Sequence, residues 1–280
     1  MRFQRIYEAV HHQPWFISAS GYDSVRDLVE RAMKGGIKMP ESRNEGLDDY
    51  FSNFVRKRPA LEIDPAGIAI ISIFGVVAPH MSNIEKACGN TGYEEIHAEI
   101  ETAIQKGAKG ILFNIDSPGG AVLGCDEAAQ AIASVTLPTV AFTDTMACSA
   151  AYYMAAGCDT VVATQTAYVG NIGTICPWVD KSKMWEVVGL AFDPITNEGA
   201  DLKSTMHGPS ITDNQRQFLQ EQLNRSGQMF HDHVSMYRNV KDEVWRAGWY
   251  SGESARALGL IDQIGNIRSA YSILLSQVLK

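Results

Sequence analysis

An alternation of strand-like and helix-like segments runs through the middle of this chain and limits the folds that it can adopt. The strand-like runs are short, apolar and rich in β-branched residues, and they lie at 68–74, 110–115, 138–142 and 160–163. The segments between them carry apolar residues at helical spacing and lie at 93–106, 121–134 and 149–156. Strands that alternate with helices form a mainly parallel sheet covered by helices, with right-handed crossovers. The sequence therefore predicts an α/β fold.

The chain on either side of this region differs in composition. Helices are predicted at 180–188, 212–237, 254–258 and 267–279, and strands at 191–196 and 260–264. Towards the N-terminus, 22–33 has helical spacing, whereas 34–62 is polar and punctuated by glycine and proline, which is typical of a connector. We therefore expect an N-terminal appendage and connector over 1–62 and one main domain over 63–280.

Composition and charge are those of a globular protein and argue against two kinds of partner. Of the 280 residues, 45% are hydrophobic and 20% are charged, and the formal net charge is −8. An acidic chain without a basic patch is not expected to bind nucleic acid. The most apolar run, 67–78, is far shorter than the ~20 residues that a membrane-spanning helix needs. We therefore expect no membrane anchor.

The cysteines indicate neither a disulfide framework nor a zinc site. There are five of them, an odd number, and no two show CxxC spacing. A reducing compartment is the simplest interpretation. No metal and no cofactor is expected.

A serine lies at a predicted junction between a strand and a helix, in the stretch Met-Ala-Cys-Ser-Ala-Ala-Tyr-Tyr at 146–153. A hydroxyl that opens a helix lies among unpaired backbone N–H groups, and the helix dipole favours negative charge there. Ser149 is therefore a candidate nucleophile, although serine is also one of the residues preferred at a helix N-cap without any catalytic role. Cys148 beside it is interpreted as a small buried thiol and not as the nucleophile.

A glycine-rich stretch, Asp-Ser-Pro-Gly-Gly at 116–120, follows the predicted strand 110–115. Adjacent glycines expose backbone N–H groups and let an extended peptide pair alongside. The N–H groups of Gly119 and Ala150 are therefore candidates for an oxyanion hole beside Ser149. Pro-Gly-Gly would also form a tight turn before a helix without any catalytic role.

A seryl hydroxyl needs a base, and the sequence offers several. None of the seven histidines has a recognisable triad context, although His207 could lie near the site. A lysine can serve if burial lowers its pKa towards neutrality. Lys203 follows the predicted strand 191–196 in a glycine-containing loop, but composition alone does not select it over Lys181 or Lys183.

Four segments, taken in order, resemble the signal peptide peptidase A family of serine peptidases. They are the stretches at 116–120 and 146–153, Val-Gly-Asn-Ile-Gly at 169–173, and the closing segment 249–265. The family's fold is similar to that of Clp protease and the crotonases, with repeated ββα units around a parallel sheet. The resemblance covers roughly 66–266.

The resemblance implies a Ser–Lys dyad in which Ser149 is the nucleophile and Lys203 the general base. The sequence departs from the family pattern in two places. Three residues separate Gly199 from Lys203 where two are usual, and alanines at 150–151 replace glycines. The oxyanion would rest on the N–H groups of Gly119 and Ala150. The substrate would bind as an added strand beside Gly120, Ala121 and Val122.

The stretch Gln-Pro-Trp-Phe-Ile-Ser-Ala-Ser at 13–20 resembles the start of bacteriophage capsid-assembly peptidases of the same family. This implies an endopeptidase that processes capsid, scaffold or portal proteins, or its own chain, during prohead maturation. It would act in the host cytoplasm or the immature virion. By analogy with family members that form rings, we expect a homo-oligomer in which the helix predicted at 212–237 packs between subunits.

Four alternatives stay open on the sequence. The chain could be a bacterial signal-peptide or quality-control peptidase, or an assembly protein that keeps the fold without catalysis. It could be a crotonase-type acyl-CoA enzyme, in which the Ser149 stretch would have no role. It could also be a peptidase whose base is His207.

Overall fold

The computed structural model describes residues 15–17, 58–178, 180, 182–191, 195–206 and 211–280. The helix predicted at 22–33 and most of the connector predicted at 34–62 lie outside these residues.

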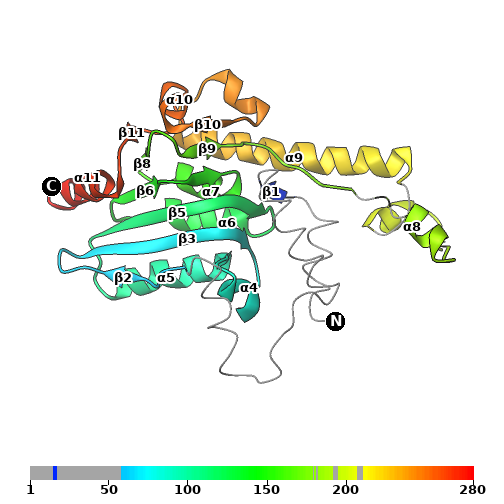
Figure 1. Ribbon diagram of the computed structural model, residues 1–280, viewed down its shortest axis with the longest axis horizontal. Helices are drawn as coiled ribbons and strands as arrows, with labels where there is room; N and C mark the ends of the chain where they lie inside the picture. Colours follow the sequence, from blue (N-terminus) through cyan, green and yellow to red (C-terminus); the bar gives the residue numbers. More distant parts are fainter. Residues whose placement is uncertain (1–14, 18–57, 179, 181, 192–194, 207–210) are drawn as a thin grey trace.

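Five parallel strands form the main sheet, and helices connect them. In spatial order the strands are β3 (Ile68–Ala78), β5 (Gly110–Ala121), β6 (Thr139–Thr143), β8 (Thr160–Ala163) and β11 (Gln263–Ile264). Along the chain, α5 (Tyr93–Gln105) lies between β3 and β5, α6 (Cys125–Ala133) between β5 and β6, and α7 (Ala150–Ala156) between β6 and β8. Figure 1 shows this alternation, which confirms the predicted α/β class.

A second set of strands branches from the C-terminal part of β5. β7 (Met146–Cys148) pairs in parallel with β5, β9 (Tyr168–Gly170) pairs in parallel with β7, and β10 (Trp249–Ser251) is antiparallel to β9. The chain passes from β6 to β7 and then into α7, and from β3 through the short helix α4 (Asn83–Ala87) to β4 (Thr91–Gly92) and then into α5. Each of these segments is a ββα unit, as the family resemblance implied.

The two faces of the main sheet have separate apolar cores because side chains alternate along each strand. Ile111 and Phe113 of β5 belong to the larger core beneath α5, α6 and α7. Leu112 faces the opposite way and packs with Ala270 and Leu274 of α11 (Ile267–Val278). The sheet is therefore buried on both faces, which explains why its strands are almost continuously apolar.

The longest helix, α9 (Asp213–Tyr237), extends well beyond the sheet. Thr212 caps it, with reciprocal hydrogen bonds to Gln215, as the predicted boundary required. Its C-terminal part packs on α7, and its N-terminal part carries the 3₁₀-helix η1 (Asp201–Met206). Figure 1 shows α9 reaching from the sheet towards α8 (Ser182–Val187). We call the described residues of 182–206, which include α8 and η1, together with the N-terminal part of α9 (213–226) the arm.

Short elements complete the described chain. They are β1 (Trp15–Ile17), β2 (Glu62–Ile63), α4 (Asn83–Ala87), the 3₁₀-helix η2 (Asp242–Arg246) and α10 (Gly252–Ala257). β2 pairs with β3 across the boundary predicted at 62/63. Arg58, on the connector side of that boundary, forms a salt bridge with Glu99 and donates to the carbonyl of Ser72.

Two predictions of local structure were wrong. The stretch 116–120 is not a turn after a strand, because β5 continues through it to Ala121 and keeps its pairing with β3 across a bulge in which Ser117 and Pro118 lie opposite Gly75. Glycine lets the strand bend here without a side chain to clash, so α6 begins only at Cys125. The predicted strand 191–196 is also not formed at Ala191, Ile195 or Thr196, and 192–194 lie outside the described residues.

Candidate active site

Ser149 occupies a strained junction between β7 and α7. Its φ of 55° and ψ of −121° are far from the conformations that residues with a side chain prefer. The strain is held from both sides, because the Ser149 N–H donates to the carbonyl of Gly170 (2.7 Å) and its own carbonyl accepts from Tyr153 N–H (2.8 Å). Strained residues at the turn from a strand to a helix are typical of catalytic nucleophiles.

The Ser149 side chain does not cap α7. It makes no capping hydrogen bond, and its Oγ is buried without a hydrogen-bond partner among the described residues. A buried hydroxyl without a partner costs about 1–3 kcal/mol and needs an explanation beyond packing. The interpretation of Ser149 as a simple N-cap is therefore wrong. The geometry instead leaves the hydroxyl available to a base or a substrate.

Helix α7 is fixed to its surroundings by buried tyrosines. Tyr152 donates its hydroxyl to the carbonyl of Leu260, and Tyr153 donates to Asp126 of α6, both at 2.7 Å. Nε2 of His233 on α9 lies 2.8 Å from the Tyr153 carbonyl, and its ring stacks on that of Tyr153. These contacts hold the first turn of α7, and hence Ser149, in one position.

The two oxyanion candidates lie on elements that meet beside Ser149. Ser117 of β5 pairs with Ala147 of β7, so Gly119 lies two residues from this contact on one strand and Ser149 two residues from it on the other. The side chain of Thr145 hydrogen-bonds Asp116 and ties the two strands together. Ala150 is the first residue of α7, so its N–H has no acceptor within the helix.

Backbone geometry explains both glycines. Gly119 has a φ of 106°, which side chains rarely tolerate, and its N–H donates to Ser117 Oγ across a long 3.2 Å. A Cβ at Gly120 would lie 1.7 Å from the carbonyl oxygen of Val77. Gly120 and Ala121 belong to β5 and Val122 follows it, so the predicted substrate strand would pair with this part of β5.

That part of β5 already carries a strand from the N-terminal segment of the chain. β1 is antiparallel to β5, with Trp15 opposite Ala121, Phe16 opposite Gly120 and Ile17 opposite Gly119. Figure 1 shows β1 beside the C-terminal end of β5. Sequence reasoning did not find this strand, because three residues are too few for an alternating pattern to show.

Lys203 does not lie beside Ser149 of the same chain. It is exposed on η1, which packs against the start of α9 through a 2.8 Å hydrogen bond from Gln215 Nε2 to the Asp201 carbonyl. Ser149 is near the other end of α9, where His233 contacts Tyr153. The helix from Gln215 to His233 is about 27 Å long at a rise of ~1.5 Å per residue, and a lysine side chain cannot bridge such a distance.

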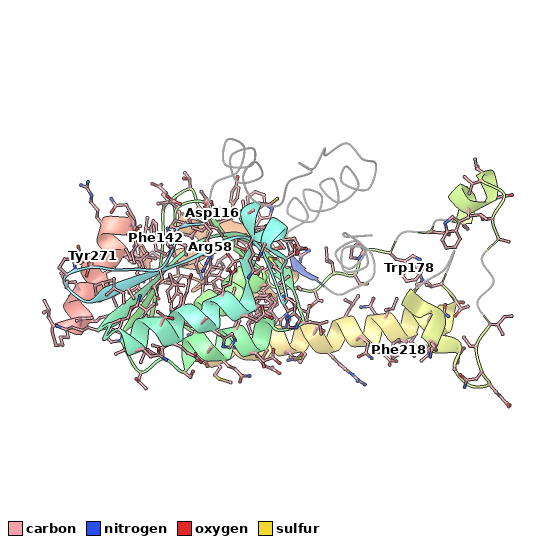
Figure 2. All side chains as sticks on the ribbon, turned by 90° about the horizontal axis from the view of Figure 1, so that it is seen from below. Arg58, Asp116, Phe142, Trp178, Phe218 and Tyr271 are labelled. Carbon is pink, nitrogen blue, oxygen red and sulfur yellow. The ribbon has the colours of Figure 1, made fainter. Side chains whose placement is uncertain are left out.

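No other candidate base in the described part of the chain is placed to accept the proton of Ser149. His207 and Lys181 lie outside the described residues, and Lys183 is exposed on α8. His233 is nearer to α7, but its Nε2 is engaged by the Tyr153 carbonyl, and burial lowers the pKa of its imidazole. Figure 2 shows how far the arm extends, because Phe218 on α9 lies far from Asp116 and Phe142.

Cys148 is a buried thiol, as the sequence indicated. Its Sγ lies 3.6 Å from the Tyr168 carbonyl, and burial raises the pKa of the thiol to about 12. It therefore stays protonated at neutral pH, and a thiol is a far weaker nucleophile than a thiolate.

Two further features concern the remainder of the molecule. A cavity of about 380 Å³ opens at the C-terminal end of α9, lined by Arg238 and Trp245 among others, and none of the predicted site residues lines it. No helix among the described residues is long and apolar enough to cross a membrane.

The hydrogen bond between Ser149 and Gly170 was not predicted, although the sequence around Gly170 had been singled out. Gly170 lies in the stretch 169–173 that carries part of the family resemblance, and it has a φ of 106°. Its carbonyl accepts the Ser149 N–H, so that N–H is not available as an oxyanion donor. The glycine-rich stretch indicated that Gly170 is a special position, but it did not show that its partner is the Ser149 N–H.

Comparison with known families gives two matches. The model described as Peptidase family S49 matches residues 131–278, just over half of the chain. The model described as NfeD1b, N-terminal domain, matches residues 78–177.

Curated relatives include phage and bacterial proteins. The chain is 28% identical over 234 residues to the head-tail preconnector protein GP5 of Enterobacteria phage P21, covering 81% of this chain and 46% of that protein. It is 29% identical over 214 residues to capsid assembly protease C of Escherichia phage lambda, covering 74% and 48%. It is 30% identical over 176 residues to a putative signal peptide peptidase SppA of Enterococcus faecium, covering 60% and 51%. The chain thus spans about half the length of these relatives.

Solved structures that resemble the chain include two acyl-CoA enzymes. An enoyl-CoA hydratase of Mycobacterium smegmatis has a TM-score of 0.44 at 14% identity, covering 79% of this chain and 76% of the other. An Mtb enoyl-CoA isomerase has a TM-score of 0.47 at 14% identity, covering 79% and 84%. Likenesses this weak carry no statement about function, and the fold description rests on the strand order itself.

Proposed function

This chain belongs to peptidase family S49, and we propose that it is a serine endopeptidase in which Ser149 is the nucleophile. The observation that carries the proposal is the Ser149 hydroxyl, which is buried at a strained turn between a strand and a helix and has no hydrogen-bond partner among the described residues. A residue that only packed or capped would have a partner or an ordinary conformation.

The proposed reaction proceeds through an acyl-enzyme. A neutral Lys203 accepts the proton of Ser149, whose Oγ attacks the carbonyl carbon of the substrate peptide. The oxyanion rests on the N–H groups of Gly119 and Ala150, and each such donor is worth about 3 kcal/mol of transition-state stabilisation. Lys203 then gives its proton to the departing amine. Water, deprotonated by the same lysine, hydrolyses the ester and frees Ser149.

The separation of Lys203 from Ser149 leads us to place the dyad between two copies of the chain. The arm that carries Lys203 also exposes large apolar side chains, which a second copy would cover. They are Val187, Val188, Leu190, Ile195 and Leu202, with exposures from 38% to 92%. A homo-oligomer would therefore bury the arm and bring Lys203 of one copy to Ser149 of the next.

Mixing two inactive variants tests this arrangement. We expect Ser149→Ala and Lys203→Ala each to lose at least about 10³-fold in casein cleavage. Lys183→Ala, at an exposed lysine of the same arm, is the matched control and should keep full activity.

Co-refolding Ser149→Ala with Lys203→Ala should recover about a quarter of wild-type activity, because randomly mixed oligomers contain some sites with one intact residue from each chain. Full activity of Lys203→Ala would reject the lysine as base. Inactive variants that stay inactive when mixed would reject the shared site.

The proposed substrates are capsid, scaffold or portal proteins during prohead maturation in the host cytoplasm or the immature virion. The named relatives from phages P21 and lambda support this role. The main alternative is a bacterial signal-peptide or quality-control peptidase, which the Enterococcus faecium relative supports. Incubation with the major capsid, scaffold and portal proteins of the same genome would distinguish the two.

A second class of function is a non-catalytic assembly protein that retains the fold. A fluorophosphonate probe separates it from a peptidase, because the probe modifies only an activated serine. Labelling of the wild type and not of Ser149→Ala supports the peptidase. Absence of label from the wild-type oligomer rejects it.

A further inference from the structure

β1 and β7 lie along the same edge of β5. β3 pairs with β5 on both sides of Ser117, at Asp116 and at Gly119, and so takes one edge of the strand. β7 pairs with Ser117, and β1 pairs with residues 119–121, so both must use the other edge. Ser149 follows β7 directly, which puts β1 next to the candidate nucleophile along one strand edge.

The direction of β1 is the direction that a substrate needs. Because it is antiparallel to β5, β1 runs from Ala121 towards Gly119, and therefore towards Ser117 and β7. Ile17, its last residue, is opposite Gly119, whose N–H is the candidate oxyanion donor. The Ile17 side chain is only 3% exposed. An aliphatic side chain is thus enclosed at the point where the backbone comes nearest to the oxyanion site.

An edge of a strand accepts one partner strand at a time, because the partner uses the free N–H and C=O groups of that edge. We propose that the strand Trp15–Ile17 occupies the substrate site as the acyl part of a substrate would, with Ile17 in the place of the residue whose carbonyl is attacked. A substrate must displace this strand, and the site selects an aliphatic residue at that position. The inference rests on the proposed peptidase function. It adds which residue the substrate site prefers and how β1 limits access to that site.

The size of the effect follows from competition within one molecule. A strand tethered to the same chain is present at a high effective concentration, of the order of millimolar for a flexible tether. If the strand fills the site for nine-tenths of the time, the apparent affinity for a substrate falls about tenfold. Release of the strand should therefore lower KM and leave kcat unchanged.

The first test introduces a charge where Ile17 is enclosed. Ile17→Asp should expel β1, because a buried carboxylate without a partner is strongly disfavoured. Its matched control is Ile267→Asp, the same substitution at a 41% exposed position at the start of α11. With a fluorogenic peptide, we expect about a tenfold lower KM for Ile17→Asp and an unchanged KM for Ile267→Asp. An equal KM in both variants overturns the inference.

A second variant fixes the strand in place. Trp15 and Ala121 are directly opposite each other in an antiparallel pair, where Cα atoms are about 4.5–5.5 Å apart and a disulfide fits. The oxidised Trp15→Cys/Ala121→Cys variant should lose the cleavage that its own reduced form shows, and a reductant should restore it. A cross-link between residues 15 and 121, verified by mass spectrometry, with activity retained overturns the inference.

A pair of inhibitors tests the specificity. The tripeptide aldehyde Trp-Phe-Ile should inhibit, because Ser149 can add to its terminal carbonyl, whereas Trp-Phe-Asp aldehyde should be at least tenfold weaker. Equal inhibition by the two contradicts the assigned position of Ile17.

These tests separate the two proposals. If no form of the chain cleaves peptide or reacts with a fluorophosphonate, the peptidase function fails. If wild type reacts at Ser149 but none of the three comparisons shows the expected difference, only the occupation of the site by β1 fails.

Discussion

The two ends of α9 lie in opposite surroundings, although they belong to one continuous helix. At the C-terminal end, Phe230, His233 and Val234 are buried against α7 and help to hold the nucleophile turn. At the N-terminal end, the helix carries η1 and Lys203 among exposed apolar side chains. One end completes the core of its own chain, and the other has few of the described residues to pack against. The difference teaches that the proposed nucleophile is held by packing within its own chain, whereas the proposed base, Lys203, lies on an exposed part of the chain.

The largest expected difference in stability is between two glycine substitutions, one in the packed sheet and one in α9. Gly120→Ala would place a Cβ 1.7 Å from the Val77 carbonyl oxygen, so β3 and β5 would have to separate. We expect a loss of about 4 kcal/mol or more. Gly227→Ala, within α9 and with no atom of the described residues within 4 Å of the added Cβ, should raise the free energy of unfolding by up to about 1 kcal/mol. Urea unfolding of both variants measures the difference, and similar stabilities would mean that the β3–β5 contact is not as close as described.

A matched pair of phenylalanines sharpens the comparison along α9 itself. Phe230 is fully buried and contacts the Tyr153 ring, so Phe230→Ala should cost about 3–5 kcal/mol. Phe218, on the arm, is only partly buried, so Phe218→Ala should cost under about 1 kcal/mol in the isolated chain.

Sedimentation of the Phe218→Ala variant tests whether the arm packs on another copy of the chain. If Phe218→Ala leaves folding intact but weakens association in sedimentation experiments, the arm packs on another copy. If both substitutions cost the same free energy of unfolding in dilute solution, the arm belongs to the core of its own chain and the contrast disappears.

The sequence predicted the parts of the site that depend on local pattern. The strand-like runs, the start of a helix at Thr212 and the serine at a helix start were all predictable, because each follows from spacing or from one residue's hydrogen bonds. The continuation of β5 through Gly119 and Gly120 could not be predicted, because it depends on pairing with β3 and β1, which are distant in the sequence. The position of Lys203 relative to Ser149 also could not be predicted from local sequence patterns, because it depends on the length and direction of α9.

A smaller effect concerns pH and the packed end of α9. Burial lowers the pKa of His233, while the Tyr153 carbonyl and the Asp126 carboxylate act in the opposite direction. The unfolded chain, with a histidine pKa of about 6.5, then binds protons more readily than the folded one. Stability should therefore be complete above pH ~6.5 and fall as the pH drops towards the lowered pKa of the folded state.

Thermal unfolding between about pH 5 and pH 7.5 measures this slope in wild type and in His233→Gln, where an amide N–H can still donate to the Tyr153 carbonyl. The variant should have a shallower slope. The slope should not vanish, because burial also lowers the pKa of His231 on the same helix. An unchanged slope would show that His233 is not enclosed against α7.

The smallest expected effect distinguishes the thiols, and it bears directly on the nucleophile. Cys148, Cys125 and Cys158 are buried, whereas Cys88 and Cys176 are partly exposed. Burial raises the pKa of Cys148 to about 12, so its thiolate is scarce at pH 8, and its neighbours also block a reagent. An aromatic disulfide reagent should modify only Cys88 and Cys176 in the native chain and all five thiols after denaturation. Rapid modification of Cys148 with loss of activity would mean that the β7–α7 turn opens readily, and a turn that opens could not hold Ser149 in the strained conformation on which the proposed chemistry depends.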